Sequence, residues 1–110
     1  MVRTKFGVYL PQGHCGELPD NISPEMHYDY LIDMASYVEK LNYHSAWLID
    51  HFYTYPGLPQ SSVLECWSTL SALAAETNRI KLAILMTCNS FRLPSLLAKM
   101  AATVDIISKG

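Results

Sequence analysis

The chain has 110 residues, enough for one domain at most. Half of the residues are hydrophobic and 16% are charged, a composition that excludes a disordered or coiled-coil chain. The formal net charge is −2 and no Lys/Arg cluster occurs, so we expect no nucleic-acid partner.

Neither an export signal nor a membrane span is visible in the sequence. Residues 1–11 contain basic Arg3 and Lys5, but their apolar run of about five residues is shorter than the roughly 7–15 of a signal peptide. No apolar run approaches the 18 or so residues that cross a bilayer. An odd number of cysteines without an export signal favours reduced thiols. We therefore expect a soluble, cytoplasmic protein with no membrane partner.

The first predicted unit is a strand followed by a helix. Residues 5–10 form a short apolar run containing Phe, Val and Tyr, which favours a buried strand that Pro11 ends. Gly and Pro mark residues 11–22 as a loop. Ser23 can cap a helix in which Pro24 takes the first position. The apolar stripe of this helix is Leu31, Ala35, Val38 and Leu41.

The second unit repeats this order. A strand over residues 45–49 ends in Asp50-His51, and a loop over residues 52–61 follows. Ser62 and Glu65 have the spacing of a capping box at the start of a helix. This helix is predicted to bury Cys66, Leu70, Leu73 and Ala74, and to stop at Asn78.

The third unit begins with a strand over residues 80–86. Pro94 starts a third helix, and Gly110 lies where a C-terminal cap is expected. The predicted apolar stripe is Leu97, Met100, Ala101, Val104 and Ile107.

The order βαβαβα predicts an α/β fold with a parallel sheet and right-handed crossovers. Periodicity does not distinguish a doubly wound sheet from part of a barrel. Gly7, Gly13 and Gly16 lack the spacing of a dinucleotide-binding Gly-x-Gly-x-x-Gly motif, which argues against a Rossmann domain. A flavodoxin-like module would need a five-stranded sheet, and only three strands are predicted.

Four stretches carry a resemblance to a known family. Residues 46–52, Ala-Trp-Leu-Ile-Asp-His-Phe, resemble the second strand and its exit in the luciferase-like flavin and deazaflavin oxidoreductases. Residues 5–11, 76–82 and 91–105 agree with that family in order and spacing. Residues 107–110 resemble the start of a family stretch that continues into strand four. The Asn-Arg and Phe-Arg-x-Pro stretches are similar to the coenzyme F420-dependent, methylenetetrahydromethanopterin reductase-like branch.

This resemblance implies a (β/α)8 TIM barrel with its site at the C-terminal ends of the strands. Barrels average roughly 250 residues, so three of eight units need about 94. We therefore expect residues 1–110 to be the N-terminal three βα units of a truncated, incomplete barrel. The implied function is oxidation or reduction of a small-molecule substrate, by hydride transfer with coenzyme F420 or by FMN-dependent monooxygenation. In either case the cofactor carries the redox chemistry.

The resemblance also implies site residues. His51 is the predicted catalytic residue, as a proton donor, acceptor or orienter; the alternative is a loop His that caps the strand. Asp50 is predicted to orient His51 or to hydrogen-bond cofactor or substrate; the alternative is a strand-end Asp that caps backbone N–H groups. Leu85, Met86 and Thr87 are predicted to form a bulge behind the cofactor ring, with a non-prolyl cis peptide at Leu85–Met86. The alternative is an ordinary buried strand end.

We expect no metal site, because no pair among the histidines and cysteines has zinc-like spacing. Nothing basic is adjacent to Cys88, which is therefore predicted to be a packing residue rather than a reactive thiol.

The alternative to an enzyme is a catalytically inactive barrel fragment that self-associates. Three parallel strands leave two sheet edges unpaired and a concave face, from residues 6–10, 46–49 and 82–86, uncovered. If about 500 Å² of apolar surface stayed open, the lost burial would be near 12 kcal/mol, comparable with the whole stability of a domain. We therefore expect a second copy related by two-fold symmetry, or the remainder of the barrel, to cover these surfaces.

Overall fold

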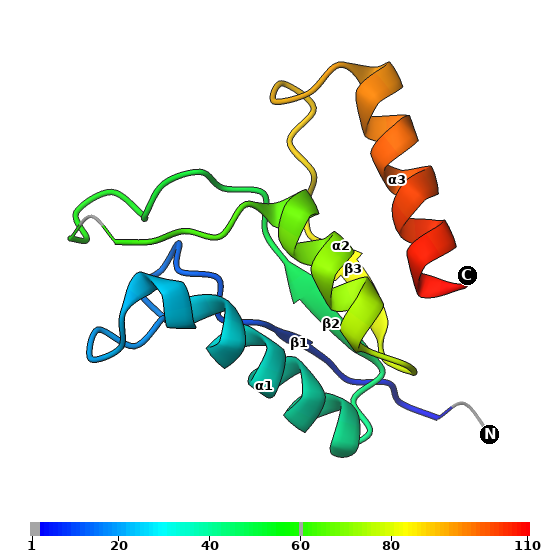
Figure 1. Ribbon diagram of the computed structural model, residues 1–110, viewed down its shortest axis with the longest axis horizontal. Coiled ribbons are helices and arrows are strands. Elements are labelled where there is room, and N and C mark those ends of the chain that lie inside the picture. The colour runs from blue at the N-terminus through cyan, green and yellow to red at the C-terminus, as the bar shows by residue number, and fades with distance from the viewer. Residues whose placement is uncertain (1–2, 60) are drawn as a thin grey trace.

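The computed structural model describes residues 3–59 and 61–110, so Gln60, within the predicted loop 52–61, lies outside the described residues. The predicted order of elements is confirmed (Figure 1). The elements are β1 (Gly7–Tyr9), the 3₁₀ turn η1 (Pro24–Met26), α1 (His27–Lys40), β2 (Ser45–Leu48), α2 (Cys66–Glu76), β3 (Lys81–Ile84) and α3 (Pro94–Ser108).

The three strands form one parallel sheet in the order β1-β2-β3. Val8 pairs with Ala46 and Ala46 with Leu82, and this row points its side chains into the hydrophobic core. The next row, which includes Tyr9 and Trp47, points to the other face because side chains alternate along a strand. The helices lie together on the first face (Figure 1), so the predicted α/β class with an open parallel sheet is confirmed.

The core lies between the sheet and the first two helices. Three of the four stripe residues predicted for α1 are buried, whereas Leu41 caps the helix and is exposed. All four residues predicted for α2 are buried. Full burial of an aliphatic side chain stabilises a fold by about 1.5–3 kcal/mol, so this cluster is the main source of cohesion. Its buried members are Leu10, Leu31, Ala35, Val38, Ala46, Leu48, Cys66, Trp67, Leu70, Leu73 and Ile80.

Two predicted helix starts differ in detail from the structure. Ser23 precedes η1 in extended conformation, but its side chain makes no capping hydrogen bond. The capping box from Ser62 is wrong, because α2 begins three residues later and Glu65 is itself the N-cap. The Glu65 carboxylate accepts from the backbone N–H of Trp67 at 3.1 Å and of Ser68 at 2.7 Å. A carboxylate satisfies these free N–H groups and also faces the positive end of the helix dipole.

The predicted stop of α2 at Asn78 is two residues late. The helix ends at Glu76, because Thr77 is extended and its hydroxyl donates back to the carbonyl of Leu73 at 2.8 Å. The N–H of Asn78 instead donates to the Glu39 side chain of α1 at 3.0 Å.

Glu39 joins the end of α1 to the start of β3. Its Oε1 also accepts from the N–H of Arg79 at 2.6 Å and of Ile80 at 2.9 Å. Partial burial alone would raise the pKa of Glu39, but these backbone donors outweigh burial and lower the pKa. The carboxylate therefore fastens the amino-terminal edge of the sheet.

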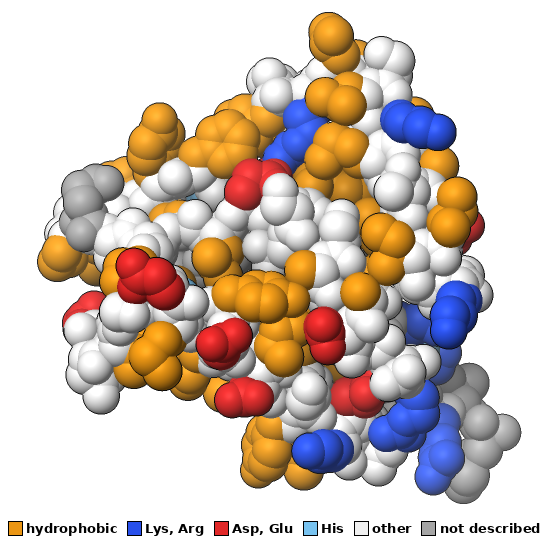
Figure 2. Space-filling view, viewed as in Figure 1, with side chains coloured by type: hydrophobic (Ala, Val, Ile, Leu, Met, Phe, Trp, Pro, Cys, Tyr) orange, Lys and Arg blue, Asp and Glu red, His pale blue; other side chains and the backbone are white. Residues whose placement is uncertain are grey.

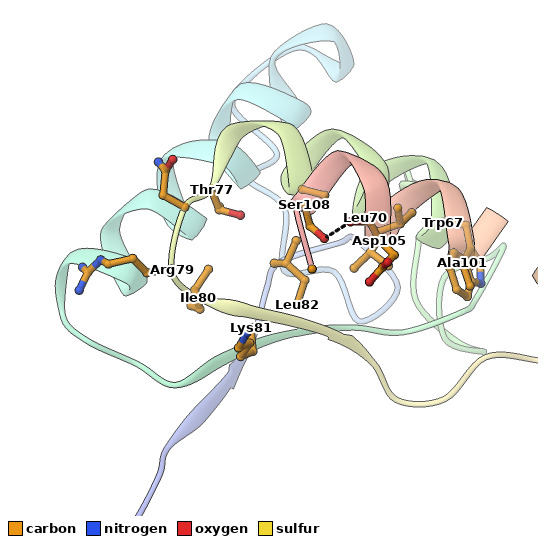
Figure 3. Close-up of a pocket in the computed structure, with 14 residues that line it drawn as sticks. Trp67, Leu70, Thr77, Arg79, Ile80, Lys81, Leu82, Ala101, Asp105 and Ser108 are labelled. Atoms are coloured by element: carbon orange, nitrogen blue, oxygen red, sulfur yellow. Dashed lines mark hydrogen bonds between the residues drawn. The ribbon is translucent and has the colours of Figure 1, made fainter. Parts of the chain in front are cut away.

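The third helix packs loosely on the rest of the molecule. Leu97, Met100 and Val104 rest half-buried on the core, but the predicted stripe residues Ala101 and Ile107 are exposed. A groove of about 320 Å³ separates α3 from α2 and the start of β3 (Figure 3). Apolar side chains gather over α2 and α3 in Figure 2, whereas acidic ones gather over α1. Only one flank of α3 meets a described neighbour, which explains why two of its five stripe residues stay exposed.

The end of α3 has a left-handed cap, formed by Lys109 at φ 63° rather than by Gly110 alone. The N–H of Gly110 then reaches the carbonyl of Asp105 at 3.0 Å. Among the described residues, no helix has the length and hydrophobicity of a membrane span.

Candidate active site at the carboxyl ends of the strands

An open hollow of about 890 Å³ lies where β2 and β3 end. Its apolar wall includes Leu85 and Met86, and aromatic side chains from both strand exits line the remainder. Among these, Phe52 and Phe91 stack with ring centroids 4.1 Å apart and planes at 17°. Because parallel strands end at one edge of the sheet, segments nearly 40 residues apart in sequence meet here.

His51 lies in this hollow and is exposed. Its ring meets the ring of His14, from the loop after β1, edge-on, with centroids 5.2 Å apart and planes at 66°. The structure therefore places His51 at the carboxyl edge of the sheet, as the sequence predicts. Its catalytic role stays a prediction.

Asp50 lies beside His51 in the chain, but its side chain is buried, at 0% exposed. Its Oδ2 accepts from the N–H of Cys88 at 2.9 Å and from Arg92 Nη1 at 2.6 Å, and its Oδ1 accepts from Arg92 Nη2 at 3.0 Å. Among the described residues it makes no hydrogen bond to His51. Asp50 thus binds the segment after β3, and its contact with a cofactor stays a prediction.

Arg92 connects Asp50 to the start of α2, because its Nη2 also pairs with the Glu65 carboxylate. Hydrogen bonds to Asp50 and Glu65 raise the pKa of Arg92, against the opposing effect of burial. Burial would raise the pKa of Glu65, but hydrogen bonds from Ser68, Trp67 and Arg92 lower it overall. We call Asp50, Glu65 and Arg92 the ion network. Together these three side chains connect the β2 exit, the β3 exit and the α2 start.

The exit of β3 is open rather than packed. Leu85 is 47% exposed and Met86 is 74% exposed, so the alternative of an ordinary buried strand end is wrong. The Leu85–Met86 peptide bond is cis, at the position that the resemblance implies. Thr87 follows and is half-buried at the rim of the hollow. Cofactor contacts of these residues stay a prediction.

Gln12 is a structural residue that sequence reasoning missed. Its fully buried amide donates to the carbonyls of Ile49 at 2.8 Å and Leu64 at 2.6 Å, and accepts from the N–H of Ile49 at 2.9 Å. It thereby joins the exits of β1 and β2 to the segment before α2. The only sequence signal is a polar residue two positions after the predicted strand, and such a residue is ordinarily expected to be exposed.

Gly13 lets the loop after β1 pass close to the segment before α2. Its φ is +107°, and a Cβ there would lie 2.1 Å from the carbonyl oxygen of Ser62. Only glycine fits both the left-handed backbone and this approach. The glycine therefore sets the path of the loop that presents His14 to His51.

Parallel strands with polar and aromatic side chains gathered at their carboxyl ends are the arrangement found in part of a βα-barrel. The family of luciferase-like monooxygenases matches residues 4–110. The chain belongs to this family.

A solved structure supports the same assignment. Monooxygenase RslO1 from Streptomyces bottropensis is 27% identical to this chain, with a TM-score of 0.74. The match covers 97% of this chain but 31% of RslO1, so the chain spans about a third of that protein. A comparison with curated protein sequences finds no significant match.

Proposed function

We propose that the chain is the N-terminal part of an oxidoreductase that binds coenzyme F420 in the hollow at the strand exits, with FMN as the alternative cofactor. The observation that carries this proposal is the position of His51, which faces a mostly apolar hollow walled by Leu85 and Met86. Membership of the luciferase-like monooxygenase family supports oxidoreductase chemistry at this edge of the sheet.

The residues present fit a planar ring with polar edges. Leu85 and Met86 would supply an apolar wall, and the Phe52–Phe91 stack closes the side between the two loops. Thr54 also lines the hollow, and its hydroxyl oxygen is buried without a hydrogen-bond partner among the described residues. Buried hydroxyls ordinarily find a partner, so Thr54 is available to a ligand.

The division of chemistry follows from these positions. The bound ring supplies the two-electron chemistry. His51 would hold or move a proton at an imidazole nitrogen, since an imidazole can both donate and accept a proton. Asp50 contributes indirectly, because its ion pair with Arg92 fixes the backbone from which His51 projects.

Cofactor choice is tested by titrating F420 and FMN separately into the chain and following quenching of cofactor fluorescence. We expect tighter binding of F420. Tighter binding of FMN would make FMN the preferred cofactor. No binding of either compound would contradict the proposal that the hollow is a cofactor site.

The role of His51 is tested in the chain joined to the remaining βα units. His51→Ala should lower kcat/KM by about 10²–10⁴-fold with little change in melting temperature. His44→Ala is the matched control, because His44 is also exposed but precedes β2 at the opposite edge of the sheet. Unchanged turnover in His51→Ala would exclude the catalytic role.

A second candidate is a catalytically inactive, self-associating barrel fragment. Among the described residues, the outer edges of β1 and β3 pair with no strand, and Tyr9, Leu85 and Met86 are exposed. We propose that a second copy or the remaining units of the barrel cover these surfaces. Light scattering at low micromolar concentration should then give a mass above 12.4 kDa. A monomer that unfolds cooperatively would contradict self-association.

A further inference from the structure

The loop after β1 brings together three side chains that sequence spacing did not pair. One imidazole nitrogen of His14, Cys15 Sγ and a carboxylate oxygen of Glu17 all lie within 4.8 Å of one another. Gly13 and Gly16 adopt positive φ, and the N–H of Gly16 donates to the carbonyl of Gly13 at 3.1 Å. This tight turn folds neighbouring residues onto one point. We propose that His14, Cys15 and Glu17 bind one divalent transition-metal ion of the zinc type.

The carboxylate of Glu17 is held in place before any ion arrives. Its Oε2 accepts from the N–H of Cys15 at 2.7 Å, and its Oε1 accepts from the N–H of Gln12 at 3.2 Å. Each oxygen of an ionised carboxylate has a second lone pair, so both remain able to bind a cation. Because Gln12 is itself anchored to β2, the carboxylate is fixed relative to the sheet.

His14 has an imidazole nitrogen without a hydrogen-bond partner. Nδ1 is buried and lies 3.1 Å from Glu17 Oε1, yet the two atoms are not aligned for a hydrogen bond. Buried polar atoms of native proteins are paired in the large majority of cases, and a metal ion would pair this one. The ring of His51 packs edge-on against His14 and limits its rotation.

The ligand set selects the class of ion. Imidazole, thiolate and carboxylate together suit zinc and its cobalt substitute, whereas magnesium and calcium prefer oxygen ligands alone. Three protein ligands with a water in the fourth position is the pattern of open zinc sites. Metal–ligand bonds of roughly 2.0–2.3 Å place the ligand atoms of a tetrahedral site about 3.3–3.8 Å apart, so small side-chain rotations close this group. Cys15 is exposed, which gives the ion an entry path, and its thiol proton passes to solvent on binding.

The test uses the full 110-residue chain and cobalt(II) as a spectroscopic substitute for zinc. Titration with Co²⁺ should saturate at one ion per chain and give a near-ultraviolet thiolate-to-cobalt band. Cys15→Ser should abolish this band, and competition with a chromophoric chelator should show zinc binding weakened at least about 10-fold in Cys15→Ser and in His14→Gln. Cys88→Ser and His44→Gln are matched controls outside the group and should leave the band and the affinity unchanged. Absence of stoichiometric binding, or equal losses in the control variants, would overturn the proposal.

Discussion

Replacing Arg92 by methionine tests whether the ion network holds the strand exits together. The Asp50 side chain is 0% exposed and that of Arg92 is 8% exposed, so the pair is shielded from water. Arg92→Met keeps most of the side-chain length but leaves the Asp50 carboxylate buried with the Cys88 N–H as its remaining donor. Removing one partner of a buried ion pair costs about 3–5 kcal/mol, because the other charge stays desolvated. A typical domain has about 5–15 kcal/mol in total, so the loss is large.

Urea unfolding followed by tryptophan fluorescence, at one fixed protein concentration, measures this cost. Arg79→Met is the control, because Arg79 also donates two hydrogen bonds, to Asn42 and to the Glu39 carbonyl, but is exposed. The control should lose about 1 kcal/mol or less. Adding Asp50→Asn to Arg92→Met should recover part of the loss, since it removes the stranded charge. Equal losses in the two arginine variants, or no recovery in the double variant, would refute the reasoning.

Three further predictions concern single groups. Gly13→Ala should destabilise the chain more than Gly57→Ala in thermal melts, because both have positive φ but only Gly13 has a backbone atom within 3 Å of an added Cβ; equal shifts would contradict this. The pKa of Glu39 is lowered by folding, so its contribution to stability is present above the unfolded pKa of about 4.3 and is lost as pH falls. Glu39→Gln should therefore flatten the acid side of the curve of unfolding free energy against pH. An unchanged slope would contradict this role of Glu39. Burial raises the pKa of the Cys66 thiol to about 12, so iodoacetamide at pH 8 with chelator should label exposed Cys15 first, as peptide mass mapping can check.

The order of elements could be predicted because its signals are local. Prolines at residues 11 and 94 mark a strand end and a helix start, and apolar periodicity identified the buried faces of α1 and α2. Three of the five residues predicted for the stripe of α3 pack on the core and two are exposed, because periodicity shows which residues share a face but not how much of that face meets a partner. The start of α2 was misplaced by three residues, since Ser62 and Glu65 each have side chains that can cap.

The site could be predicted only where a family motif marked it. The positions of His51 and of the cis bond before Met86 follow from such motifs. The hydrogen-bond partners of Gln12 and Arg92 do not follow from a motif. Gln12 bonds Leu64, 52 residues away in the sequence, and Arg92 bonds Asp50, 42 residues away. No local period in a single sequence links groups at such separations.

The two edges of the sheet are fastened by different chemistry, and this difference explains why the candidate site can stay open. At the amino edge, the Glu39 carboxylate accepts hydrogen bonds from three backbone N–H groups at the start of β3. At the carboxyl edge, the members of the ion network pair with one another, and Gln12 separately bonds the backbone of Ile49 and Leu64. The last residue of the β2 exit that the ion network holds is therefore Asp50, one residue before His51. Since Asp50 is anchored through its own side chain, the backbone can position the His51 ring, which contacts the ring of His14 edge-on and lines the hollow.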